Sequence, residues 1–128
     1  MRWFIPLLLA LPAAAQDAMT ADEFEAYVTG KTLTYSAGGP PYGVEEYRPG
    51  RTVSWRFTDS ECQNGVWYPK GEDICFAYED DPEDEKCWRF TLGPEGLVAR
   101  FTSDPSDLTL YEVEQGEELL CPGPRIGV

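Results

Sequence analysis

The sequence contains no histidine and few basic residues: 10 Lys and Arg stand against 23 Asp and Glu, which gives a net charge of -13 at pH 7. Without histidine, the commonest general base of enzymes and the orienting member of a Ser-His-Asp triad are both missing. The negative charge repels phosphates, which argues against nucleic acids and anionic membranes as partners. The composition therefore favours a non-enzymatic protein that acts by binding, and it permits a cationic partner.

Long apolar runs are also missing. The one sizeable run, Trp3–Ala14, has about 12 residues, follows Arg2 and ends in the small residues Ala13-Ala14-Ala15. Such a segment is too short to span a bilayer and is typical of a cleaved secretory signal, whereas a buried N-terminal helix fits poorly with Arg2. We predict a signal peptide at residues 1–15 and a periplasmic or secreted protein without membrane insertion. Cleavage removes Arg2 and so changes the net charge of the protein from -13 to -14.

The chain has four cysteines and no C-x-x-C pair: Cys62, Cys75, Cys87 and Cys121. A zinc site would need all four thiolates, because no histidine is present to complete it. In an oxidising compartment two disulfides are expected instead, and three pairings are formally possible.

A short helix is expected at the start of the mature chain. Thr20 and Glu23 form the pattern of a capping box, apolar residues follow at helical spacing, and Gly30 supplies a stop, so the helix should cover 21–29. We expect a linker at 16–20, a single domain at 21–121 and a tail at 122–128.

From Lys31 onward the apolar period changes from 3.6 to 2, which is typical of half-buried antiparallel strands. Turn residues such as Pro49-Gly50 separate these segments. The spacing of about one strand per ten residues predicts an all-β fold: an eight-stranded antiparallel meander barrel with one short N-terminal helix. The strands are expected at 31–36, 42–48, 51–58, 65–69, 72–79, 87–92, 96–102 and 108–114.

The stretch "ICFAYEDDPEDEKCWRF" reads as a hairpin. The register that sets Cys75 opposite Cys87 also sets Ile74 opposite Trp88 on the apolar face, and directly opposed residues lie within disulfide range. We therefore favour a Cys75–Cys87 bridge, which leaves Cys62–Cys121 as the second bridge.

The tip of this hairpin has six acids in seven positions, interrupted by Pro82. It has no glycine and does not match a calcium-binding loop, so no metal is predicted there. A solvated tip, a docking surface for a basic partner and a cation site are the three interpretations, in that order. The docking candidates are Glu79, Asp80, Asp81, Glu83, Asp84 and Glu85.

Aromatic residues on the apolar faces of the strands are candidates for a ligand cavity. An eight-stranded barrel is just wide enough either to pack solid or to hold one small ligand, so these residues either fill the core or contact a ligand. The candidate ligand-binding residues are Trp55, Phe57, Trp88 and Phe101. No catalytic residue is predicted, because the adjacent Glu45 and Glu46 should point to opposite faces of a strand and no other carboxylate pair stands out.

The segments "ADEFEAYVTGKTLTY", "YRPGRTVSWRF", "CQNGVWYPKGEDICFAY" and "CWRF" resemble small exported alphaproteobacterial proteins of unknown function. Their shared pattern is a helix ending in G-K-T, a G-x-W strand, an I-C-F strand and a C-W strand, and here it covers Ala21 to Phe101. The resemblance implies a periplasmic, lipocalin-like β-barrel and supplies no catalytic residue and no cofactor.

Two binding functions follow as expectations, and a carboxylate-based hydrolase is the third and least favoured hypothesis. The first is a monomeric binding module that holds a small apolar or amphipathic molecule in the barrel. The alternative is a protein-binding or inhibitory module that docks a basic partner through its acidic surface.

Overall fold

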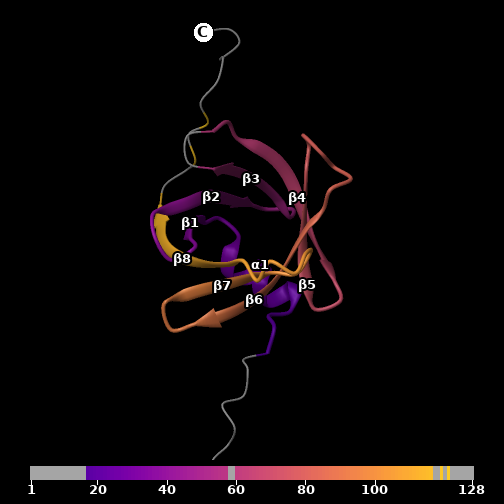
Figure 1. Ribbon diagram of the computed structural model, residues 1–128. Helices are drawn as coiled ribbons and strands as arrows, with labels where there is room; N and C mark the ends of the chain where they lie inside the picture. The colour runs from indigo at the N-terminus through magenta and orange to yellow at the C-terminus, as the bar shows by residue number, and fades with distance from the viewer. Residues whose placement is uncertain (1–16, 58–59, 117–118, 120, 122–128) are drawn as a thin grey trace, which may run out of the picture.

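The computed structural model describes residues 17–57, 60–116, 119 and 121. The predicted signal peptide and the tail at 122–128 lie outside these residues. Eight strands form a closed antiparallel barrel in sequence order, with one short helix, as Figure 1 shows. The predicted all-β meander is confirmed, and each strand lies within one or two residues of its expected position. The elements are α1 (Ala21–Val28), β1 (Thr32–Ser36), β2 (Pro41–Arg48), β3 (Thr52–Phe57), β4 (Gln63–Lys70), β5 (Asp73–Tyr78), β6 (Lys86–Gly93), β7 (Gly96–Phe101) and β8 (Thr109–Gly116).

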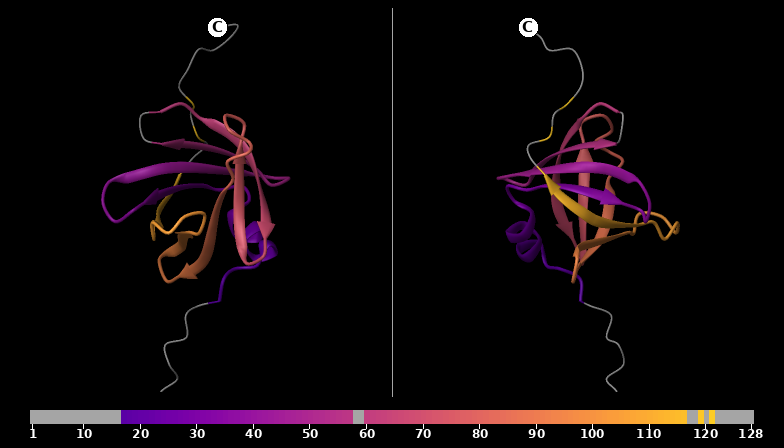
Figure 2. Two further views of the ribbon diagram at one scale, coloured as in Figure 1. Left: turned by 45° about the vertical axis from the view of Figure 1, so that its right-hand side comes forward. Right: turned by 90° about the vertical axis from the view of Figure 1, so that its left-hand side faces the viewer.

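Each strand pairs with its neighbours in sequence, and β8 returns to pair with β1, for example Thr32 with Gly116. Closure therefore leaves no free sheet edge. In an up-and-down barrel the connections alternate between the two ends. The connections β1–β2, β3–β4, β5–β6 and β7–β8 lie at one end, and α1 lies at the other. The right-hand view of Figure 2 shows α1 opposite the β1–β2 turn and the segment between β7 and β8.

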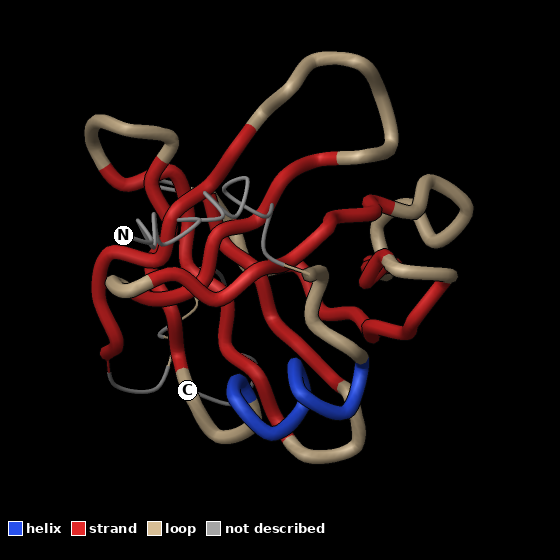
Figure 3. Tube along the Cα trace, turned by 90° about the horizontal axis from the view of Figure 1, so that it is seen from below, coloured by secondary structure: helices blue, strands red, loops and turns tan. Residues whose placement is uncertain are grey.

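Helix α1 closes its end of the barrel. The predicted capping box is present, because the Thr20 hydroxyl accepts from the Glu23 N–H and the Glu23 carboxylate accepts from the Thr20 N–H. Phe24 is completely buried, and its ring lies 5.1 Å from that of Trp67 and 4.4 Å from that of Phe90. Gly30 ends the helix with a φ of 84°, which glycine adopts without strain. Figure 3 shows this helix in blue beside the strands of the barrel.

Both predicted disulfides are confirmed. Cys75 and Cys87 are paired residues of β5 and β6, with Cα atoms 4.0 Å apart, and Ile74 is paired with Trp88 as the register required. Cys62–Cys121 joins the start of β4 to the segment after β8, with Cα atoms 5.3 Å apart. Two disulfides indicate an oxidising, non-cytoplasmic environment. Among the described residues, no helix is long and apolar enough to cross a membrane.

Candidate functional site

A cavity of about 490 Å³ occupies the half of the barrel away from α1. Its lining includes residues next to all four connections of that end: Tyr42, Gln63, Asp81 and Leu108. Alternation along the strands sends one side chain in two toward this space. The volume falls within the range of small-molecule sites, roughly 300–1,000 Å³.

All four aromatic residues predicted to contact a ligand line this cavity. The rings of Trp88 and Phe101 lie 4.7 Å apart on one wall, and those of Trp55 and Phe57 lie 5.3 Å apart on another. Phe57 is 40% exposed, and Trp55 is buried. The aromatic faces therefore form an apolar wall that continues from the mouth into the interior.

Gly43 makes room for the ring of Trp55. A Cβ atom at this position would lie 2.3 Å from the indole carbon Cζ2, which is closer than any real contact. The ring thus lies directly across the backbone of β2. Any larger residue would displace the Trp55 side chain and change the shape of the cavity.

A carboxyl group is buried in the wall of the cavity. Glu45 is only 3% exposed, and its Oε1 accepts a 2.8 Å hydrogen bond from the Tyr78 hydroxyl. Its Oε2 is buried and has no hydrogen-bond partner among the residues that the structure describes. Burial raises the pKa of Glu45 to about 8, although the Tyr78 hydrogen bond and the charge of Arg48 act in the opposite direction. A buried polar atom without a hydrogen-bond partner is uncommon in proteins and calls for an explanation.

Two more tyrosines extend this polar cluster. The hydroxyls of Tyr35 and Tyr47 lie 2.8 Å apart in the interior. Burial raises the pKa of Tyr35, Tyr47 and Tyr78 well above the usual value for tyrosine, so all three stay neutral near pH 7. The cavity therefore combines aromatic walls with a small polar group of three hydroxyls and one carboxyl.

The acidic hairpin tip contributes to the mouth of the cavity. Asp80, Asp81 and Asp84 line it, as does Asp104 from the segment between β7 and β8. Among the described residues of the lining the one basic residue is Lys86, which forms an ion pair with Asp84. Hydrogen bonds from Ser106 lower the pKa of Asp104, which keeps it ionised. The mouth is therefore negatively charged.

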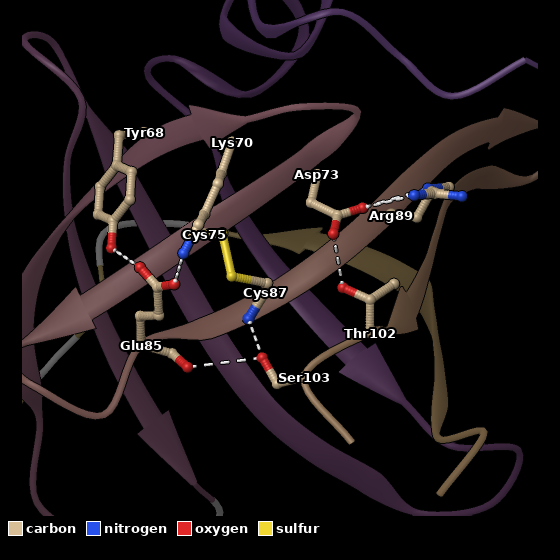
Figure 4. Close-up of a disulfide and its surroundings, with 9 residues drawn as sticks. All are labelled: Tyr68, Lys70, Asp73, Cys75, Glu85, Cys87, Arg89, Thr102 and Ser103. Carbon is tan, nitrogen blue, oxygen red and sulfur yellow. Dashed lines mark hydrogen bonds and ion pairs between the residues drawn. A yellow bond between two sulfur atoms is a disulfide. The ribbon is translucent and has the colours of Figure 1, made fainter. Parts of the chain in front are cut away.

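The other acids of the tip face elsewhere. Glu85 accepts hydrogen bonds from the Tyr68 hydroxyl and, at 2.5 Å, from Lys70 on the outer surface, and the Lys70 bond lowers the pKa of Glu85 (Figure 4). Glu79 and Glu83 are exposed and do not line the cavity. The docking candidates are thus divided between the mouth and the outer surface.

The base of this acidic loop is held firmly. The Cys75–Cys87 disulfide joins its two strands, and the Cys87 N–H donates a 2.8 Å hydrogen bond to the Ser103 hydroxyl (Figure 4). Beside it, Asp73 accepts hydrogen bonds from Arg89 at 3.1 Å and from the Thr102 hydroxyl at 3.0 Å. These contacts fix where the acidic side chains stand relative to the cavity.

Within the described part of the chain, one set of three potential metal ligands converges, namely Cys75, Glu85 and Cys87. The two sulfurs are bonded to each other, so neither is available as a thiolate.

Sequence reasoning missed Glu45, Gly43 and Tyr78 as members of the site. Tyr78 could have been found, because it shares the inward parity of Phe76. Glu45 carried no such signal, because both faces of "YGVEEYR" mix aromatic and acidic residues. Only the pairing of β2 with β3, which sets Glu45 beside Trp55, shows which glutamate points inward.

Comparison with protein-family models, with curated proteins and with solved structures finds no match to this chain.

Proposed function

We propose that this protein is a non-enzymatic binding module that holds one small amphipathic molecule inside a lipocalin-like barrel. The observation that carries the proposal is the cavity of about 490 Å³, which is lined by aromatic rings and closed at one end by α1. A core packed solid would leave no such volume, since protein interiors are normally close-packed. The buried hydroxyls and carboxyl are the few polar groups that orient a ligand in an otherwise apolar site.

Binding rather than catalysis fits the chemistry of the site. One carboxyl, that of Glu45, is buried in the cavity wall, and its hydrogen-bond partner is the neutral hydroxyl of Tyr78. A glycosidase uses two carboxyl groups on either side of the scissile bond. The aspartates that line the cavity, such as Asp80, lie in the connections at its mouth, whereas Glu45 lies within strand β2.

The test is a titration followed by tryptophan fluorescence, because Trp55 and Trp88 both line the cavity. Small amphiphiles with apolar bodies should give saturable quenching that persists at high salt. The variant Ala99→Phe places a large ring in the cavity and should abolish quenching, whereas Val113→Phe, at a strand position that is 54% exposed, should not. Quenching that is absent in the parent protein, or equal in both variants, would rule the proposal out.

A second candidate is a module that docks a basic protein. It is favoured by the exposed acids of the hairpin tip, of which four take part in no ion pair within the described residues: Glu79, Asp80, Asp81 and Glu83. Such an interaction should weaken steeply as ionic strength rises. Capture of basic periplasmic proteins at low salt, lost when Glu79 to Glu85 are neutralised, would support this candidate over the cavity.

We further propose that the protein is periplasmic or secreted and is processed after Ala15. The two disulfides support export. The intact mass of the exported protein should correspond to a chain that starts at Gln16. A mature chain that retains Trp3 to Ala10 would contradict this.

A further inference from the structure

The buried Oε2 of Glu45 indicates which kind of ligand the cavity takes. This oxygen has no hydrogen-bond partner among the described residues, while Oε1 of the same group is already bonded to the Tyr78 hydroxyl. Glu45 is one of the residues that line the cavity, so a molecule inside the barrel lies against this side chain. A deprotonated carboxylate only accepts hydrogen bonds, so its best complement is an N–H donor, above all a charged one.

The walls and the mouth of the cavity also favour a cationic ligand. Aromatic rings attract cations through their faces, and Trp55, Trp88 and Phe101 lie along the cavity. Asp80, Asp81 and other acids at the mouth repel anions and attract cations before they enter. A fatty acid would therefore meet unfavourable charge at the entrance.

We propose that the ligand is an organic amine with an apolar, preferably aromatic, body, and that its ammonium group donates a hydrogen bond to Oε2 of Glu45. This inference rests on the proposed ligand-binding function and specifies the class of ligand. Glu45 is then the specificity-determining residue. The tyrosine cluster and the aromatic walls hold the rest of the molecule.

Binding of the amine also releases the Glu45 proton to solvent. The titratable or charged groups around Glu45 are Tyr35 from β1, Tyr78 from β5, and Tyr47 and Arg48 on β2 itself; β3 contributes Trp55, which does not titrate. The tyrosines stay neutral, because burial raises the pKa of each well above its usual value. In the empty cavity burial favours the protonated carboxyl. When an ammonium group arrives, the carboxyl loses its proton to solvent, and a carboxylate–ammonium pair forms.

The experiment compares four probes that share one skeleton: 4-phenylbutylamine, 4-phenylbutanol, 4-phenylbutanoate and the trimethylammonium analogue of the amine. Tryptophan fluorescence measures the Kd of each for the full protein, for Glu45→Gln and for Glu46→Gln. The Glu46 variant is a matched control, because Glu46 is the next residue of the same strand, faces the other side and is paired with Arg48 at 2.6 Å. We expect the amine to bind tightest and Glu45→Gln to weaken only the amine, by about tenfold to hundredfold.

A measurement on the unmodified protein does not depend on the folding of any variant. Calorimetry in buffers of different ionisation enthalpy should show that close to one proton is released per amine bound at pH 7, and none for the alcohol. Equal affinities for amine and alcohol, or tightest binding of 4-phenylbutanoate, would overturn the inference and leave the proposed function standing. A trimethylammonium probe that binds as well as the amine would overturn the hydrogen bond to Oε2. If none of the four probes binds, both proposals fail.

Discussion

The Tyr78 hydroxyl on β5 donates a 2.8 Å hydrogen bond to Glu45 on β2, so one buried contact joins strands that are not neighbours in the barrel. Its effect is electrostatic as well as geometric. The bond satisfies Oε1 and favours the charged form of the carboxyl, but desolvation outweighs it, and the pKa of Glu45 rises to about 8.

The raised pKa makes stability depend on pH in an unusual direction. Between its ordinary pKa of 4.5 and about 8, the folded protein holds a proton at Glu45 that the unfolded chain has lost. The free energy of unfolding therefore falls as pH rises through this window, by an amount on the order of 5 kcal/mol from this group alone. Glu45→Gln should remove this decrease in the free energy of unfolding. Urea unfolding at pH 5, 6.5 and 8 measures it, with Glu46→Gln as the control, and parallel pH dependence in all three proteins would contradict the prediction.

Phe24 is the residue through which α1 closes the barrel. It is completely buried against Tyr47, Trp67, Phe76 and Phe90. Phe24→Ala should lower the free energy of unfolding by about 3–5 kcal/mol, since it leaves a cavity at the core. Val113→Ala, at an exposed position, should change it by about 0.5 kcal/mol or less. Urea denaturation measures the loss in free energy of unfolding for both variants. Similar losses would show that α1 is not needed to close the barrel.

The two disulfides should differ in what they contribute. Cys62–Cys121 closes a loop of 59 residues and Cys75–Cys87 one of 12. By chain entropy the first should stabilise the protein by about 4 kcal/mol and the second by about 3 kcal/mol. The paired variants Cys62→Ala/Cys121→Ala and Cys75→Ala/Cys87→Ala test this by denaturation. Non-reducing peptide mapping verifies the pairing first, and a Cys62–Cys87 peptide would refute it.

The acidic tip should bind no calcium. Its carboxylates diverge: Asp84 pairs with Lys86, and Glu85 faces Tyr68 and Lys70. Titration calorimetry with millimolar calcium should show no saturable heat. The variant Asp80→Asn/Asp81→Asn/Asp84→Asn should keep or slightly raise the melting temperature, because like charges repel and one exposed ion pair contributes little. Stoichiometric calcium binding that this variant loses would show the prediction to be wrong.

The hairpin of β5 and β6 shows how far sequence can predict such a fold. One register joined Cys75 to Cys87 and set Ile74 opposite Trp88, and the structure has both relationships. Two independent constraints, the cysteine pairing and the apolar faces, agreed on this register, so it was favoured over the other pairings. The same alternation placed the aromatic residues on the inner face.

The buried carboxyl could not be predicted in this way. Alternation says that Glu45 and Glu46 point in opposite directions, but it does not say which one points inward. The free energy that decides this comes from β1 and β3 packing on both sides of β2, where Leu33 and Trp55 are the partners of Glu45. Likewise, whether inward aromatic residues fill a barrel or leave a cavity depends on ring positions set by contacts such as that of Trp55 over Gly43.

The pairing of β1 with β8 has a kinetic consequence. The first strand completes its hydrogen bonds only when the last strand is in place, so the fold has high contact order and should form in milliseconds to seconds rather than microseconds. Until then both strands present open edges, which are templates for aggregation. Helix α1 is the first described element of the chain, yet Phe24 needs β2, β4, β5 and β6 before it has anything to pack against. A chain that stops short of β8 therefore lacks its closing ladder and should aggregate rather than persist as a partial barrel.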